Sequence, residues 1–236
     1  MSKTNITWSE SIFDGYKLIY QPPSTGKGGA GVLVNNSSFD TITHLEDPNF
    51  NVVKACDCHN CLVENVSVKL TNNNREIFAS SIYRHPNGNV EHFANSLENM
   101  LSSVNERSWH ILAGDFNINL LNSNESKTNH YINNLLQANY IPCINLPTRF
   151  SENTATIIDH IMLKVPRKLI QTKVSAGNLI TDLTDHLPVF ALINMKIPKI
   201  DKRPYIRLFT KRRTAKFKSN SDQFDPLVTT VNNSLA

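Results

Sequence analysis

The segment Gly114–Asn117 (GDFN) combines a carboxylate and a carboxamide directly after the apolar run Trp109–Ala113. At the end of a strand, Asp115 and Asn117 would point to the same side of the sheet. Oxygen ligands in that arrangement can bind a hard cation or orient a water molecule beside a phosphate. Asp and Asn also favour ordinary turns, so this segment by itself leaves a functional site and a strand-end turn both open.

A histidine and its neighbouring acid follow in Thr184–Pro188 (TDHLP), at the start of the last apolar run. Histidine transfers protons near neutral pH, which makes His186 a candidate general base. Asp185 beside it could hold a metal ion. Asp-His pairs also occur in surface turns, so this segment too leaves both interpretations open.

A third acid, Asp159, lies within the apolar run Ile157–Leu163. A carboxylate there is costly unless it has a cationic or hydrogen-bonding partner. Asp159 is a candidate to orient His186, since a histidine base needs an acceptor that fixes its tautomer. The alternative is a structural pair with Arg149. The next residue, His160, should point to the opposite face, and we interpret it as structural or exposed.

The fourth segment is Ser80–Asn87 (SSIYRHPN), at another strand end. The Tyr83 hydroxyl and the Arg84 guanidinium could both contact a phosphate. The alternative is an aromatic strand end closed by a proline turn.

Length and composition limit the classes of protein that could carry these residues. The chain has 236 residues, of which 40% are hydrophobic and 19% charged, as in an ordinary folded protein. No apolar stretch is long enough for a membrane span, and the first residues lack the pattern of a signal peptide. We therefore expect an intracellular protein without a membrane contact, and the sequence indicates no obligate protein partner.

Three of the four cysteines, Cys56, Cys58 and Cys61, lie within six residues. Neither their number nor their spacing suits a disulfide framework, so reduced thiols are expected. Together with His59 they could offer four zinc ligands. Structural zinc normally joins two ligand pairs separated by a longer loop, so a cysteine-rich turn is the favoured interpretation.

Positive charge is concentrated near the C-terminus. Between Lys196 and Lys218 there are ten basic residues and one acid, although the net charge of the whole chain is only +4. We expect a domain over residues 1–195 and a basic, flexible segment over 196–236. Such a segment suits a polyanion partner or nuclear import, with Lys211, Arg212 and Arg213 as candidate contacts, or a solvated linker.

Hydrophobic periodicity predicts a layered α/β protein. Amphipathic helices are expected over residues 90–106 and 126–138. Strands are expected over six runs in addition to Trp109–Ala113, namely Tyr16–Gln21, Ala30–Asn35, Cys61–Leu70, Glu76–Tyr83, Ile157–Leu163 and Leu187–Ile193. A short basic helix is expected over Thr210–Lys218. Each candidate site residue therefore falls at a strand end.

Taken in order, the motifs resemble the endonuclease/exonuclease/phosphatase superfamily, and within it the apurinic-like endonuclease domain of non-LTR (LINE-type) retrotransposons. The resemblance covers about residues 10–194 and rests on the following segments: GYKLIYQPPSTGKGGAGVLV, SIYRHPN, LAGDFNINL, LPTRFSENTATIIDHI and TDLTDHLPVF. It implies a DNase I-like four-layer α/β sandwich of two facing mixed sheets flanked by helices. It also implies hydrolysis of a phosphodiester that depends on Mg²⁺ (or Mn²⁺), with DNA as the substrate that is nicked.

The resemblance also implies roles for individual residues. His186 would be the general base or would polarise the phosphate, with Asp159 as its partner. Asp185 would help to bind the metal ion. Asp115 and Asn117 would position the nucleophilic water and the scissile phosphate, which Tyr83 would contact. Contacts to nucleic acid are expected from Arg84 and Arg149 and from the basic segment, Lys211, Arg212 and Arg213.

The chain departs from the family pattern at its N-terminus. Family members begin with a strand that carries an Asn, followed by a strand whose Glu is the principal metal ligand. Here the first strand is expected to be absent, and Lys3 stands near the position of the Glu. An ammonium in place of a carboxylate would weaken cation binding, so activity could be impaired. The alternatives are a catalytically dead nucleic-acid-binding remnant of a retroelement and another phosphoesterase of the superfamily.

Overall fold

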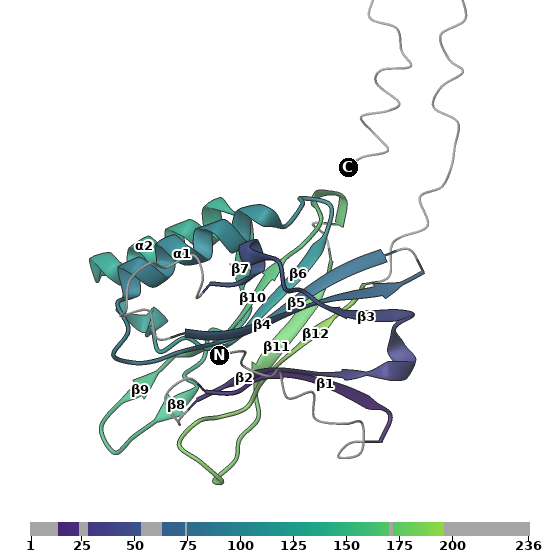
Figure 1. Cartoon of the computed structure of the whole chain (residues 1–236). Coiled ribbons are helices and arrows are strands. Elements are labelled where there is room, and N and C mark those ends of the chain that lie inside the picture. Colours follow the sequence, from purple (N-terminus) through teal and green to yellow (C-terminus); the bar gives the residue numbers. More distant parts are fainter. Residues whose placement is uncertain (1–13, 24–27, 53–62, 74, 170–171, 196–236) are drawn as a thin grey trace, which may run out of the picture. The chain divides into compact units, whose positions relative to one another are not determined.

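A six-stranded mixed sheet forms the centre of the computed structural model (Figure 1). The structure describes residues 14–23, 28–52, 63–73, 75–169 and 172–195. In spatial order the strands are β3 (Thr41–His44), β4 (Val63–Asn72), β5 (Arg75–Arg84), β6 (Trp109–Asp115), β10 (Asp159–Lys164) and β7 (Tyr140–Pro142). All neighbours are antiparallel except β5 and β6, which are parallel and are connected through a helix. The carboxyl ends of β5 and β6 therefore lie side by side.

Two antiparallel strand pairs lie against one face of this sheet. The first pair, β1 (Tyr16–Gln21) and β2 (Ala30–Asn35), packs over β4 and β5. The second, β11 (Val174–Asn178) and β12 (Val189–Ile193), packs over β10. The two pairs are not hydrogen-bonded to each other within the described residues. A further short hairpin, β8 (Arg149–Phe150) and β9 (Ala155–Thr156), extends from the end of the sheet (Figure 1).

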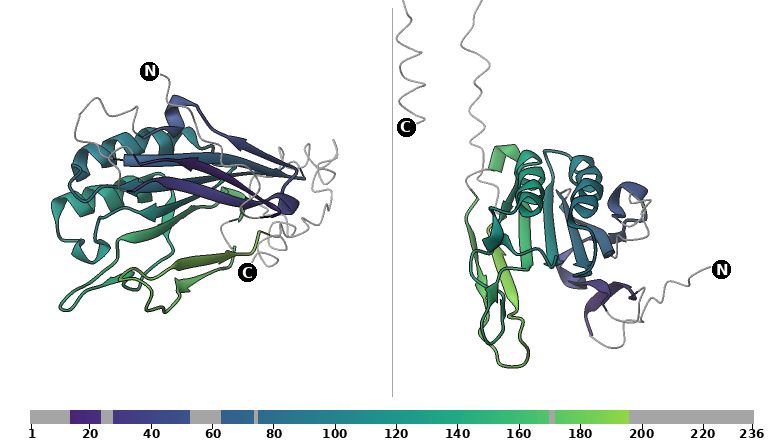
Figure 2. Two further views of the ribbon diagram at one scale, coloured as in Figure 1. Left: turned by 60° about the horizontal axis from the view of Figure 1, so that its bottom comes forward. Right: turned by 90° about the vertical axis from the view of Figure 1, so that its left-hand side faces the viewer.

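Helices cover the other face. Both α1 (Val90–Ser103) and α2 (Ser126–Gln137) lie on that side, as the right-hand view of Figure 2 shows. Their apolar stripes meet the inward side chains of the sheet in one buried cluster, which includes Phe93, Leu97, Tyr131, Leu112 and Met162. Asn89 caps α1 by accepting hydrogen bonds from the backbone of Glu91 and His92. The described residues also form four short 3₁₀ turns: η1 (Asn36–Ser38), η2 (Pro48–Phe50), η3 (Leu120–Asn122) and η4 (Arg167–Leu169).

The predicted α/β class is confirmed, and details of the arrangement differ from the expectation. The described residues form three layers rather than four, because both helices bury their apolar stripes against the same face. The layer opposite the helices consists of two separate pairs rather than one continuous mixed sheet. The first helix ends at Ser103, three residues before the expected end. No helix in the described part of the chain is long and apolar enough to cross a membrane.

Candidate active site

Four polar side chains form a row across neighbouring strands of the central sheet. Glu64 on β4 pairs with Tyr83 on β5, Tyr83 with Asp115 on β6, and Asp115 with Asp159 on β10. Residues directly opposite in a ladder face the same side, so the row lies on the face away from the helices. The sheet register thus brings together Tyr83, Asp115 and Asp159, which were predicted as site residues. It adds Glu64, which the sequence had not singled out.

Asp159 holds the imidazole of His186. The two carboxylate oxygens of Asp159 lie 3.2 and 3.0 Å from His186 Nδ1, and the Thr148 hydroxyl donates to Asp159 Oδ2 at 2.7 Å. Thr148 is completely buried, and its oxygen also accepts the backbone N–H groups of Ile158 and Asp159. Asp159 therefore partners His186 and not Arg149, the alternative that the sequence left open. An Nδ1–H that donates to Asp159 leaves Nε2 available for other chemistry.

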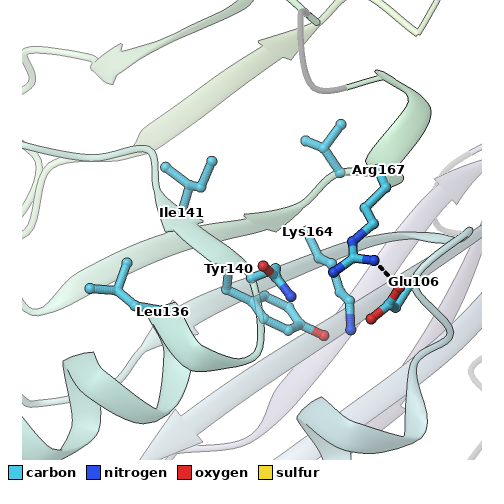
Figure 3. A pocket seen from close by; sticks show the side chains of 8 residues that line it. Glu106, Leu136, Tyr140, Ile141, Lys164 and Arg167 are labelled. Atoms are coloured by element: carbon cyan, nitrogen blue, oxygen red, sulfur yellow. Dashed lines mark ion pairs between the residues drawn. The ribbon is translucent and has the colours of Figure 1, made fainter. Parts of the chain in front are cut away.

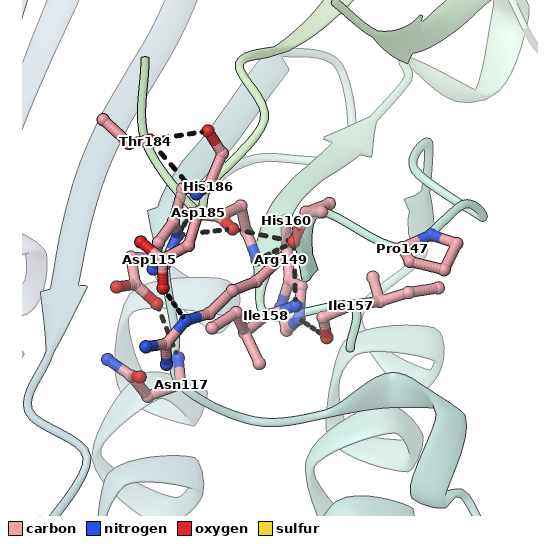
Figure 4. A network of polar contacts seen from close by, with 12 residues as sticks. Asp115, Asn117, Pro147, Arg149, Ile157, Ile158, His160, Thr184, Asp185 and His186 are labelled. Carbon is pink, nitrogen blue, oxygen red and sulfur yellow. Dashed lines mark hydrogen bonds and ion pairs between the residues drawn. The ribbon is translucent and has the colours of Figure 1, made fainter. Parts of the chain in front are cut away.

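Asp115 completes a compact cluster with this pair. Ligand atoms of Asp115, Asp159 and His186 lie within 4.8 Å of one another. Asp115 and His186 are labelled in the close-up of Figure 4. Burial, and then the negative charge of Asp159, raise the pKa of Asp115 above its ordinary value. Two carboxylates held this close favour a cation or a shared proton between them. The cluster faces a cleft of about 370 Å³ lined by these residues together with Gly114, Thr184, Leu187, Pro188 and Val189.

A buried arginine shapes the loop after Asp115. The Arg84 side chain is only 1% exposed and donates to the backbone oxygens of Phe116 (2.6 Å), Gly88 (2.6 Å) and Asn117 (2.7 Å). Asn117 has a left-handed backbone (φ 49°), and its amide donates to Arg84 O at 2.7 Å. The prediction that Arg84 contacts nucleic acid is therefore wrong for this structure, because its guanidinium is engaged inside the protein.

The same loop is supported by His160 from the helix face. His160 is 1% exposed, stacks on Phe116 at 4.8 Å between ring centroids, and has Nε2 3.0 Å from Ile118 O. Burial lowers its pKa to about 4, so it is neutral at neutral pH. His160 thus faces away from Asp159, as expected, and is structural rather than exposed.

Glycines allow the backbone to approach the site closely at two points. A Cβ on Gly114 would lie 1.8 Å from the Ile82 carbonyl oxygen, and one on Gly28 would lie 2.4 Å from the Tyr83 ring. Both glycines have positive φ, 146° and 107°. The Gly28 backbone therefore packs against Tyr83, whose pKa is raised by burial and then by Asp115 and Glu64.

Asp185, the predicted metal ligand, lies outside the cluster. Its Oδ2 accepts a hydrogen bond from Arg149 Nε at 2.7 Å, and about half of each side chain is exposed. Arg149 lowers the pKa of Asp185 by that hydrogen bond. The structure consequently pairs two residues that the sequence had assigned separately to metal and to nucleic acid.

Another hollow, of about 190 Å³, lies beside Tyr140 and Lys164 (Figure 3). Lys164 Nζ donates to Val104 O at 2.8 Å, so it caps the end of α1 instead of facing a ligand. An exposed ion pair between Arg167 and Glu106 at 3.4 Å borders it. This hollow lacks the clustered acids and histidine of the cleft, which remains the better candidate site.

Sequence reasoning missed Thr148 and Glu64. Thr148 is part of the quoted LPTRF segment, and Glu64 is a carboxylate in an apolar alternating run, the same signal that pointed to Asp159. Several predicted residues lie outside the described part of the chain: Lys3, the cysteines Cys56, Cys58 and Cys61 with His59, and the basic residues Lys211, Arg212 and Arg213.

Comparison with known proteins supports the arrangement. The model of the endonuclease-reverse transcriptase family matches residues 77–190, which contain most of β5, all of β6 and β10, and His186. The chain resembles an endonuclease/exonuclease/phosphatase family protein from Leptotrichia buccalis C-1013-b at 15% identity and TM-score 0.54, over 77% of this chain and 73% of that one. The chain has the endonuclease/exonuclease/phosphatase fold.

Two further structures of this fold carry names that refer to DNA or to a retroelement. The endonuclease domain of TRAS1, a telomere-specific non-LTR retrotransposon, is 15% identical with TM-score 0.55, over 76% of this chain and 79% of that chain. D. rerio TDP2 complexed with single strand DNA product is 12% identical with TM-score 0.52, over 76% of this chain and 77% of that chain. No curated protein sequence matches the chain. The predicted resemblance to the endonuclease/exonuclease/phosphatase superfamily is confirmed.

Proposed function

We propose that the chain is a divalent-metal-dependent phosphodiesterase that nicks DNA, and that it is the endonuclease domain of a non-LTR retrotransposon. The observation that carries this proposal is the Asp115, Asp159 and His186 cluster at the mouth of the cleft. The family match over residues 77–190 and the fold shared with the TRAS1 endonuclease domain support the retroelement assignment.

His186 is the group that moves the proton. Asp159 accepts from its Nδ1–H and stabilises the imidazolium, while Thr148 fixes the carboxylate. Nε2 then takes a proton from the attacking water, or in its protonated form polarises the phosphate. Asp115, held between its ladder partners Tyr83 and Asp159, orients the water beside the phosphorus. The Tyr83 hydroxyl binds a phosphate oxygen.

The donor set fits a hard divalent cation. Asp115 and Asp159 supply oxygen ligands, and burial, followed by the negative charge of Asp159, raises the pKa of Asp115. Asp115 and Asp159 would hold Mg²⁺ or Mn²⁺, and Glu64 lies in the same row. When bound, the ion stabilises negative charge that develops on the phosphate.

Nicking of supercoiled plasmid by the full chain tests the proposal. We expect nicking with Mg²⁺ or Mn²⁺, loss of nicking with EDTA, and loss in His186→Ala. His44→Ala is the matched control, since His44 lies on the edge strand β3. If His186→Ala and wild type were equally inactive but bound DNA equally well, the chain would be a nucleic-acid-binding remnant and the proposed activity would be rejected.

A further inference from the structure

The loop between β11 and β12 carries the two most exposed large apolar side chains among the described residues. Ile180 is 95% exposed and Leu183 is 86% exposed, and Leu179 at the start of the loop is 55% exposed. Single exposed apolar residues are common on protein surfaces. Here, however, three of them lie within five residues of one loop, and that loop ends at the Asp185–His186 pair.

Hydrogen bonds hold this loop in a defined form. Leu179 N–H donates to Pro188 O at 2.8 Å and closes its base. Near its end, the Thr184 hydroxyl donates to His186 O at 2.8 Å and accepts His186 N–H at 3.1 Å. Leu183 N–H is 3.2 Å from Thr181 Oγ1. The exposed side chains therefore project from an ordered support that is continuous with the catalytic histidine.

The loop is also joined to the neighbouring hairpin. Phe150 N–H on β8 donates to Asp185 O at 3.0 Å, and Leu187 N–H donates to Thr148 O at 2.7 Å. The hairpin adds Phe150, which is 47% exposed. Both segments extend from the same end of the protein (Figure 1), and Thr184, His186 and Leu187 line the cleft. A polymer whose phosphate reaches His186 must therefore lie against this loop.

We propose that the Leu179–Asp185 loop binds duplex DNA by inserting Ile180 and Leu183 against base pairs beside the phosphate to be cleaved. This inference rests on the proposed function and adds a binding surface to it. Apolar side chains that enter the grooves of a duplex wedge between base steps and unstack them.

The test compares the double variant Ile180→Ser/Leu183→Ser with Leu136→Ser/Ile141→Ser, which changes two apolar side chains that are 50% and 57% exposed on α2 and β7. The full chain is titrated in EDTA against a duplex that contains 2-aminopurine, a base whose fluorescence rises when it is unstacked. For the loop variant we expect binding to weaken about tenfold or more, together with loss of the fluorescence rise. The control variant should behave as wild type.

A small diester substrate separates this inference from the proposed function. With metal present, the loop variant should hydrolyse bis(p-nitrophenyl) phosphate as fast as wild type, because that substrate has no base stack. If wild type hydrolysed neither substrate, the proposed activity would fail, while the binding and fluorescence results would still decide the role of the loop. Unchanged duplex binding and fluorescence in the loop variant would overturn the proposed insertion of Ile180 and Leu183. So would loop-dependent binding to phosphatidylcholine/phosphatidylserine vesicles without any unstacking of DNA.

Discussion

The two faces of the six-stranded sheet differ in burial and in chemistry. The face under the helices is sealed by a single apolar cluster, and its polar groups are bonded to one another: Ser67 to Ser80, Ser80 to His110, and His110 to Tyr140. The opposite face carries the polar row from Glu64 to Asp159, of which Asp115 and Asp159 line the cleft. Both faces bury apolar clusters, because the two strand pairs cover the second face, but that second face also carries the candidate site.

Alternation along each strand couples the two faces. Tyr83 and Asp159 belong to the polar row, and the residues that follow them, Arg84 and His160, are buried on the helix face. Both buried residues hold the backbone of residues 116–118, next to Asp115. A site residue and a supporting residue are therefore neighbours in sequence. Substitution of the site residue should mainly lower activity, whereas substitution of the supporting residue should also lower stability.

The largest effect expected is on catalysis. Asp159→Asn removes the charge that orients His186 and stabilises its protonated form, so the rate of DNA nicking should fall by about 10²–10⁴-fold. The melting temperature should change little, because the amide preserves the shape of the side chain. Plasmid nicking and thermal circular dichroism measure the two quantities. Glu98→Gln, an exposed acid on α1, is the control; an equal loss of rate in both variants would contradict the assigned role.

The next effect compares how much a side chain on each face of the central sheet contributes to the free energy of unfolding. Leu112 on β6 is fully buried under the helices, and Ile111 beside it is only partly buried on the opposite face. Leu112→Ala should lower the free energy of unfolding by about 2–5 kcal/mol, and Ile111→Ala by clearly less, because less packed surface is lost. Urea unfolding measures both. Equal losses would mean that the two faces contribute alike.

Arg84→Lys tests how the faces are coupled. A lysine keeps the charge but loses the fork that reaches three carbonyls, so we expect a loss of about 1–3 kcal/mol in unfolding free energy. The kcat for nicking should fall, because the loop that carries Asn117, next to Asp115, loses hydrogen bonds from the guanidinium. The exposed Arg107→Lys is the control. A normal kcat in Arg84→Lys would show that the loop keeps its form without the guanidinium.

Much of the site could be predicted from sequence, and the failures have a common cause. The motifs around Asp115, Asp159 and His186 were sufficient to propose residues that the fold does bring together. Arg84 was misassigned because local sequence does not reveal that a charged side chain is buried among carbonyl groups. The assignment of Asp185 to the metal ion stays a prediction. Its ion pair with Arg149 was not foreseen because the pair depends on a bridge between β8 and the segment at His186, which are far apart in the chain.

The helices and strands with the clearest hydrophobic periodicity were the ones that the sequence predicted well. Both helices and the long strands followed clear periodicity, and their bounds agree with the structure to within a few residues. Strands of two to five residues, such as β8, β9, β7 and β11, carry too few side chains for a pattern. Their pairing is set by the strands beside them. Thr148 escaped notice for the same reason, because its role exists only once β8 approaches Asp159.

The last effect expected is a loss of stability in acid from the helix face. Burial lowers the pKa of His110 to about 3 and that of His160 to about 4, so both are neutral in the folded protein. In the unfolded chain they take up protons near pH 6.5. Their contribution is therefore fully present above about pH 6.5 and is lost as the pH falls towards their folded pKa values. At pH 5 each of the two histidines should lower the free energy of unfolding by about 2 kcal/mol relative to neutral pH.

His160→Gln, which keeps a donor for Ile118 O, should reduce the decline in unfolding free energy between pH 7.5 and pH 5, measured with urea. His44→Gln on the exposed edge strand should not. An unchanged decline in His160→Gln would mean that burial of His160 does not cause the acid sensitivity.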